Sequence, residues 1–175
     1  MAIYEFEGKV PKIGQDSYVH PEAVIIGDVT IGDKCYIGAT AVLRGDYGGI
    51  VIGNGTDVQD GTVIHTEPET KALIGEDCLI GHCAMIHGPL VVGNRVLVGM
   101  KATVLDSCEL GEGSAVAACS MVKRNTRVAP GKMVMGIPAR ETGEVSETAA
   151  LYTGIGVKLY QDLALRSLNS MNRIG

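Results

Sequence analysis

Three histidines lie close together in the middle of this 175-residue chain and could ligate a metal ion. His65 occurs in the stretch VIHTEP, and His82 and His87 occur five residues apart in IGHCAMIHGPLVVG. Neutral imidazole is the commonest metal ligand among side chains. Scattered histidines are also common without a metal, so the spacing has to show whether these three converge. His20, in YVHPEA, is interpreted as an ordinary turn residue.

An aliphatic residue recurs every six positions through most of the chain, and Gly often follows it. The repeat is interrupted at RGDYGGIV and at HTEPETKAL. A six-residue period fits neither a helix nor a simple strand alternation, but it fits a short strand plus a turn, as in hexapeptide β-helix proteins. The predicted fold class is mainly β, a parallel β-helix. The repeat resembles that of hexapeptide-repeat proteins, which implies three hexads to each triangular coil. The repeated aliphatic positions are Val19, Ile25, Ile31, Ile37, Leu43, Ile52, Val58, Ile64, Ile74, Ile80, Ile86, Val92, Val98, Val104, Leu110, Val116, Val122, Val128 and Val134.

The same repeat gives His65 and His87 equivalent places, directly after Ile64 and Ile86. If four residues of TEPETKA are looped out, the two histidines lie one coil apart and stack on one face. Parallel strands lie about 4.8 Å apart, so both imidazoles can bind one ion at a Zn–N distance of about 2.0–2.1 Å. His82 lies nearer the adjoining corner, so a neighbouring subunit could present its own His82 instead. This geometry favours a symmetric oligomer with metal at its interfaces.

Composition and charge argue against several other classes of protein. The net charge is −5, the pI is about 5.3, and no run of Lys and Arg suggests a nucleic-acid partner. No stretch approaches the ~18 consecutive apolar residues of a membrane span, and the first residues lack the features of a signal peptide. The expected compartment is therefore the cytoplasm. The five cysteines form no CxxC pair and are expected to be reduced, with Cys35, Cys78 and Cys108 at small inner positions.

The chain also resembles a known family. The stretches LRGDYGGIVIGNGTDVQDGTVIHTEPE and IGHCAMIHGPLVVGNRVLVGM are similar to the γ-class carbonic anhydrases. The resemblance implies a left-handed parallel β-helix of hexapeptide repeats with a C-terminal α-helix, assembled as a homotrimer with three metal sites between subunits. It implies that His65 and His87 come from one subunit and His82 from the next. The implied metal is Zn²⁺, with Fe²⁺ or Co²⁺ in some members.

The resemblance also implies a reaction and roles for further residues. Three imidazoles leave coordination positions open, so a bound water can act as hydroxide near neutral pH and hydrate CO₂ to bicarbonate. By the family pattern Gln59 orients that hydroxide, and Arg44 and Asp60 form an ion pair between subunits that Asp46 supports. A plain surface turn is the alternative for the Arg-Gly-Asp step. Tyr160 is the candidate for a C-terminal Tyr that approaches the metal, and core packing is its alternative role.

The chain departs from the best-characterised members of that family. Tyr47 follows the Arg-Gly-Asp step where a proton-shuttling Glu is expected, and the loop after the first histidine is short. Glu67 and Glu69 lie nearby but off the pattern, and Asp57 stands where an Asn holds the Gln. The chain is more similar to the short-loop subgroup that includes proteins of carnitine and phenylacetate operons. Two alternatives stay open: an acyl-CoA thioesterase or acyltransferase of the hexapeptide-repeat class, and a non-catalytic metal-binding assembly protein.

The repeat stops near residue 140, which divides the chain into a β-helix domain, 1–140, and a C-terminal helix, 141–175. Ser146 is a suitable helix cap. Leu151, Ile155, Leu159 and Leu163 recur at every fourth position and predict an apolar stripe. The helix is expected to pack along the β-helix near a subunit boundary.

Overall fold

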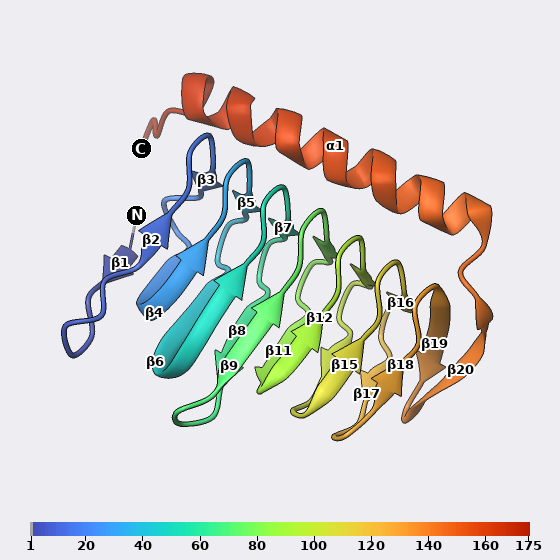
Figure 1. Ribbon diagram of the computed structural model, residues 1–175. Helices are drawn as coiled ribbons and strands as arrows, with labels where there is room; N and C mark the ends of the chain where they lie inside the picture. Colours follow the sequence, from blue (N-terminus) through green and yellow to red (C-terminus); the bar gives the residue numbers. More distant parts are fainter. Residues whose placement is uncertain (1) are drawn as a thin grey trace.

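The computed structural model describes residues 2–175 as a parallel β-helix of about seven coils flanked by one long helix (Figure 1). This confirms the predicted left-handed parallel β-helix and the mainly β class. All nineteen repeated aliphatic residues point into the coils, and each is 5% exposed or less. The core is thus one continuous column of Ile, Val and Leu, with small residues filling the corners.

The coils have three faces, each a ladder of short parallel strands. Face 1 is built from β3 (Tyr18–Val19), β5 (Tyr36–Ile37), β7 (Asp57–Val58), β10 (Leu79–Ile80), β13 (Leu97–Val98), β16 (Ala115–Val116) and β19 (Lys132–Gly136). Face 2 contains β1 (Ala2–Tyr4), the first halves of β4 (Val24–Ile31) and β6 (Val42–Ile52), then β8 (Val63–Thr66), β11 (Met85–Gly88), β14 (Thr103–Val104) and β17 (Met121–Val122). Face 3 contains β2 (Lys12–Ile13), the second halves of β4 and β6, then β9 (Lys71–Ile74), β12 (Leu90–Val92), β15 (Cys108–Leu110) and β18 (Arg127–Val128).

Three corners join these faces. The far corner joins face 3 to face 1, and the His82 corner joins face 1 to face 2. At both, the third residue after the aliphatic usually has positive φ, as at Arg95 (56°) and Lys101 (57°). Such a residue turns the chain from one face to the next, and the side chain of the small residue that follows points into the core. The buried thiols of Cys35 and Cys78 occupy this inner place at the far corner, and Cys108 occupies the equivalent place at the corner between faces 2 and 3, as predicted.

The pair corner, which joins face 2 to face 3, departs from this pattern in the coils that carry β6, β8 and β11. β6 runs straight through the corner as one 11-residue strand. Residues 67–70 are looped out between β8 and β9, as the interrupted repeat predicted. In the next coil β11 meets β12 through Pro89. The corner becomes regular again beyond β14, where Ser107 has a φ of 58°.

Helix α1 (Glu147–Ser170) runs back along face 1 towards the first coil (Figure 1). Ser146 caps it, as predicted, by accepting a hydrogen bond from the backbone N of Ala149. The predicted apolar stripe does not face the coils: Leu151, Ile155 and Leu159 are 65%, 49% and 63% exposed, and of its four residues Leu163 alone packs against the cluster that contains Tyr36. The helix lies so close to face 1 that a Cβ on Gly156 would be 2.6 Å from Leu79, so only small side chains fit between them. The helix residues buried there are Thr153, Val157, Ala164 and Ser167.

The segment that leads into α1 forms a hairpin, in which β20 (Ala139–Glu144) pairs antiparallel with β19. The predicted division at residue 140 falls inside β20. Within residues 2–175, no helix is both long and apolar enough to cross a membrane.

Candidate metal centre on two corners

His65 and His87 lie side by side on face 2. They occupy matching positions of β8 and β11, and their ring centroids are 5.5 Å apart. Arg44 of β6 is in register with His65 one coil earlier, so the three side chains form one column leading to the pair corner. The stacking predicted from the six-residue repeat is therefore confirmed by the strand register.

Asp46 holds the first member of this column in place. Its Oδ1 lies 3.0 Å from His65 Nε2, and its Oδ2 accepts a hydrogen bond from Arg44 Nη1 at 2.5 Å. Burial alone would raise the pKa of Asp46, but the hydrogen bonds from Arg44 and His65 outweigh it, and the pKa lies below its ordinary value. The carboxylate is thus ionised at neutral pH and orients both neighbours.

Three residues that sequence analysis did not assign surround His87. Asp106 Oδ1 lies 3.7 Å from His87 Nδ1 and accepts a hydrogen bond from Arg124 Nε at 2.9 Å. The carboxylate of Glu67, from the loop after His65, completes a group whose ligand atoms lie within 4.8 Å of one another: Glu67, His87 and Asp106. The repeat could have located Asp106, because it lies one coil after Gly88, the neighbour of His87.

His82 lies on the opposite edge of face 2, at the His82 corner. Its Nδ1 is 3.1 Å from Asp60 Oδ2, and its backbone N donates to Gln59 Oε1 at 3.1 Å. The hydroxyl of Tyr160, from α1, is 3.4 Å from His82 Nε2. Tyr160 also packs against Tyr36, with ring centroids 5.1 Å apart. The packing role left open for Tyr160 is therefore observed, and its approach to a metal ion stays a prediction.

The predicted ligands thus fall into two groups on each chain. In the part of the chain that the structure describes, the ring nitrogens of His65, His82 and His87 form no cluster within 4.8 Å. Arg44 pairs with Asp46, and Asp60 pairs with His82. The ion pair between Arg44 and Asp60 of different subunits, and the joining of the two groups across an interface, stay predictions.

The donor chemistry fits a metal such as Zn²⁺. Each of the three imidazoles has a carboxylate beside one ring nitrogen: Asp46 for His65, Asp60 for His82 and Asp106 for His87. At 3.0 and 3.1 Å, Asp46 and Asp60 are close enough to accept from His65 and His82, which fixes the tautomer and leaves the second ring nitrogen as the ligand. Asp106 lies 3.7 Å from His87, beyond hydrogen-bond distance, and the second nitrogen of His82 already has the Tyr160 hydroxyl 3.4 Å away. Three imidazoles and open positions are typical of catalytic rather than structural zinc sites.

Asp57 lies under α1 next to the His82 corner. Its ladder on face 1 is otherwise aromatic or aliphatic, with Tyr36 and Leu79 as its neighbours in register. Neither carboxylate oxygen has a hydrogen-bond partner among residues 2–175. Burial raises the pKa of Asp57 well above its usual value, and the nearby amide of Gln59 offsets only part of this. Burial, then Asp57 and Asp60, also raise the pKa of Tyr160, so its hydroxyl keeps its proton at neutral pH.

An apolar slot of about 400 Å³ opens beside His82. One wall is α1, with Tyr152, Ile155 and Leu159, and the other is formed by coil residues that include Met100. The polar end of the slot is made by Gln59, His82 and Tyr160.

Two segments of the chain match hexapeptide families. Residues 11–45 match the family described as bacterial transferase hexapeptide (six repeats), and residues 89–123 match hexapeptide repeat of succinyl-transferase. Over 166 residues the chain is 42% identical to the carnitine operon protein CaiE of Escherichia coli strain K12, covering 95% of this chain and 84% of that protein. The chain belongs to the hexapeptide-repeat transferase family. Members of this family are commonly trimers.

Solved structures of the hexapeptide-repeat family have the same fold. A Bacillus cereus protein, described as a presumed acetyltransferase, has a TM-score of 0.92 and 28% identity, covering 96% of this chain and 98% of that one. A hexapeptide transferase family protein from Anaplasma phagocytophilum has a TM-score of 0.87 and 35% identity, covering 93% of this chain and 96% of that one. These similarities establish the family, and the finer resemblance to γ-class carbonic anhydrases stays a prediction.

Proposed function

We propose that the chain is a metal-dependent enzyme that hydrates CO₂ reversibly at the interfaces of a homotrimer. His65 and His87 of one subunit and the partner subunit's His82 would hold Zn²⁺, or Fe²⁺ or Co²⁺. A divalent ion in such a site lowers the pKa of a bound water towards about 7. The observation that carries the proposal is the stacking of His65 and His87 in strand register, with a carboxylate beside each imidazole.

The remaining site residues have complementary roles in this proposal. The Oε1 atom of Gln59 accepts a hydrogen bond from His82 N, so its amide NH₂ is left to donate to the reacting oxygen. Tyr160, with its raised pKa, serves as a hydrogen-bond donor rather than a base. Hydration releases a proton, and Glu67, whose side chain is 46% exposed, provides a solvent-facing carboxylate beside His87.

Acyl transfer or thioester hydrolysis is the second candidate function. The similar proteins of known structure favour this class over CO₂ hydration, since they include a presumed acetyltransferase and a hexapeptide transferase. The apolar slot that ends at His82, Gln59 and Tyr160 favours it as well, because CO₂ has no acyl chain to fill such a slot. The same three histidines could serve hydrolysis of a thioester, since water is the nucleophile in both reactions.

Metal content and two activity assays distinguish these functions. The protein is purified without chelator, its metal is quantified per chain, and CO₂ hydration is followed by stopped flow with Zn²⁺ and with anaerobic Fe²⁺. We expect about one metal per chain, as a three-histidine site requires. We expect His82→Ala to abolish hydration and His20→Ala, outside the site, to leave it unchanged.

The other outcomes decide between the candidates. Metal binding without hydration, together with cleavage or transfer of acyl-CoA thioesters that depends on His82, would replace the first function by the second. Metal binding with neither activity would favour the assembly protein. Absence of metal after loading under all these conditions would overturn the metal centre itself.

A further inference from the structure

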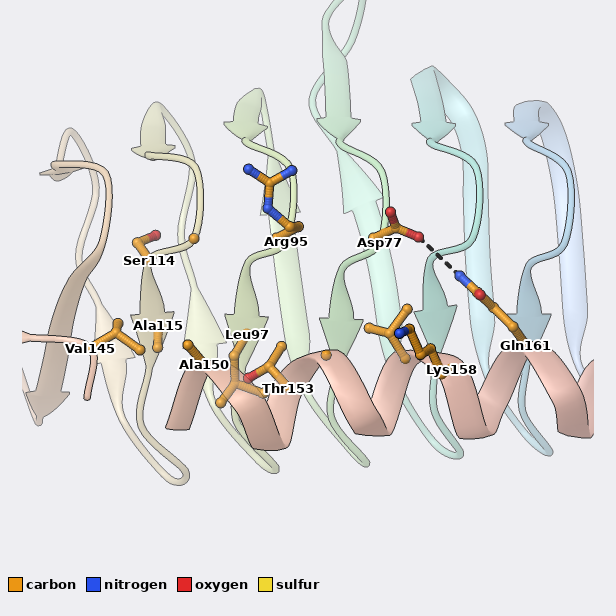
Figure 2. A pocket seen from close by; sticks show the side chains of 13 residues that line it. Asp77, Arg95, Leu97, Ser114, Ala115, Val145, Ala150, Thr153, Lys158 and Gln161 are labelled. Carbon is orange, nitrogen blue, oxygen red and sulfur yellow. Dashed lines mark hydrogen bonds between the residues drawn. The ribbon is translucent and has the colours of Figure 1, made fainter. Parts of the chain in front are cut away.

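A second cavity, of about 360 Å³, lies between α1 and the coils (Figure 2). Its lining residues lie on the other flank of the helix from the slot beside His82. It lies between the N-terminal half of the helix and the far corner of three successive coils. Asp77, Arg95 and Gly113 mark this corner, and Leu97 and Ala115 form the floor. The volume falls in the range of small-molecule sites, about 300–1,000 Å³. The cavity shares no histidine with the metal centre.

Gly154 keeps one side of this cavity open. A Cβ at this position would meet no heavy atom within 4 Å, whereas a Cβ on Gly156, two residues later, would clash with Leu79 at 2.6 Å. A larger residue at 156 would therefore force Leu79 to shift, whereas packing places no such demand at 154. Because Gly weakens a helix interior relative to Ala, a glycine at 154 is unfavourable for the fold alone. The absence of a side chain at Gly154 leaves this part of the cavity open to a ligand.

The polar groups around the cavity limit what it can bind. Asp77 accepts a hydrogen bond from Gln161 at 2.9 Å, closing one end, as the dashed line in Figure 2 shows. Arg95 pairs with Glu112 but keeps further N–H donors. Lys158 lies within 4 Å of no carboxylate in residues 2–175. The hydroxyls of Ser114 and Thr153 also line the cavity, and Ser114 Oγ has no hydrogen-bond partner among residues 2–175. One anionic group could bind at Lys158, and the floor beyond it is apolar.

The length of the cavity sets the size of the ligand. From Ala150 to Lys158 the helix makes about two turns, roughly 12 Å. We propose that this cavity binds a medium-chain carboxylate. Its carboxylate would bind Lys158, and Arg95 could join it if its side chain moved away from Glu112. The hydrocarbon chain of the ligand would cover Leu97, Ala115 and Val157.

The site would stay accessible in the proposed trimer. Face 2 carries the two ligand groups on its two edges, so both of its corners face neighbouring subunits. The far corner is the one that borders face 1 and face 3 only, away from these contacts. Binding of a carboxylate in this cavity would require neither the metal nor either proposed activity.

Isothermal titration of octanoate tests the proposal. The protein is treated with chelator, so that no metal can bind the carboxylate. We expect one octanoate per chain, with 1-octanol and octyltrimethylammonium binding at least tenfold more weakly. Lys158→Ala should weaken octanoate binding about tenfold, because a charge-assisted hydrogen bond is lost. Gly154→Leu should abolish it while the melting temperature stays the same or rises.

Two matched variants guard the interpretation. Lys12→Ala removes an exposed lysine elsewhere and should leave octanoate binding unchanged, as should His82→Ala. Unchanged affinity in folded Gly154→Leu protein would overturn the site. Equal affinity for 1-octanol would overturn recognition of the carboxylate, and no binding of octanoate at all would overturn the proposal as a whole.

Discussion

The two corners that border face 2 differ in regularity and in chemistry. At the His82 corner, successive aliphatics such as Val58 and Ile64 stay six residues apart. At the pair corner the spacing grows to nine between Leu43 and Ile52 and to ten between Ile64 and Ile74. The fold does not need these extra residues, because the same corner is regular beyond β14. The repeat is interrupted where Asp46 and Glu67 approach the histidine pair. We infer that the extra residues serve the site and not the packing of the core.

The largest effect is expected when two inactive variants, one altered at each corner, are mixed. His82→Ala removes the ligand of the His82 corner, and His87→Ala removes one from the pair corner, so each homotrimer should lose metal and activity almost completely. Co-refolding the two variants in equal amounts should restore about a quarter of the sites. Each interface needs one chain of each kind in one order, which random mixing supplies one time in about four. Metal content per chain and activity measure the recovery.

The matched control for this experiment mixes His65→Ala with His87→Ala. Both variants damage the pair corner, so no order of subunits assembles an intact site and no recovery is expected. Recovery in this control, or none in the first mixture, would contradict a site shared between corners of different subunits.

Replacing one glycine by alanine at each corner should distinguish two causes of lost stability, steric clash at Gly88 and backbone strain at Gly61. A Cβ on Gly88 would lie 2.7 Å from Thr66 Oγ1 and 3.0 Å from Ala72 Cβ. Gly88→Ala should therefore lower the free energy of unfolding by about 1–3 kcal/mol and weaken metal binding through the adjacent His87. Chemical denaturation and metal titration measure the two effects.

The comparison variant lies at the other corner. Gly61 has a φ of +70°, and a Cβ at this position would come no nearer than 3.1 Å to Cys83 Sγ. Gly61→Ala should cost about 1–2 kcal/mol through backbone strain and weaken metal binding less than Gly88→Ala does. A larger loss of metal affinity in Gly61→Ala than in Gly88→Ala would contradict the assignment.

The β-helix and the histidine pair could be predicted because both depend on one short period. Each hexad repeats the same local task, so the position of Ile86 relative to Ile64 follows from counting once the looped residues are recognised. Of the carboxylates around His87, one could be predicted from the sequence and one could not. The period does locate Asp106, one coil after Gly88, but it does not locate Glu67, which reaches His87 through a loop whose path no period describes.

The orientation of α1 could not be predicted from its apolar pattern. Leu151, Ile155 and Leu159 favour a buried stripe by hydrophobicity alone. The distance between helix and coils decides otherwise, because close contact over Leu79 admits only small residues. That distance is a tertiary property. The cavity beside Gly154 depends on it too, so it was not visible in the sequence.

The carboxylates at the two corners should give opposite pH dependence. The pKa of Asp57 is raised on folding, so the folded state becomes less favourable as pH rises from the unfolded pKa, about 3.9, through the folded value. Asp57→Asn should remove this loss and raise stability at pH 7 by about 1 kcal/mol or more, with the gain disappearing below about pH 4. Thermal melts from pH 3.5 to 8 measure it.

Asp46→Asn should have the opposite sign. The pKa of Asp46 is lowered on folding, so its contribution is present above the unfolded pKa and is lost as pH falls through the folded value. This variant should be less stable than the parent at neutral pH, and the difference should shrink on acidification. Parallel melting curves for both variants would show that the two carboxylates do not differ in environment.

The smallest expected effect concerns the regular corner itself. Lys101 has a φ of 57° and an exposed side chain that pairs with no carboxylate within 4 Å in residues 2–175. Lys101→Gly should relieve the strain of a left-handed residue, about 1–2 kcal/mol, while the greater chain entropy of Gly offsets roughly 0.5–1 kcal/mol. The net gain should therefore be about 1 kcal/mol or less, with unchanged metal affinity, measured by denaturant unfolding. A loss of stability would mean that the Lys101 side chain makes contacts across a subunit interface. The result would then be independent evidence that the His82 corner lies at that interface.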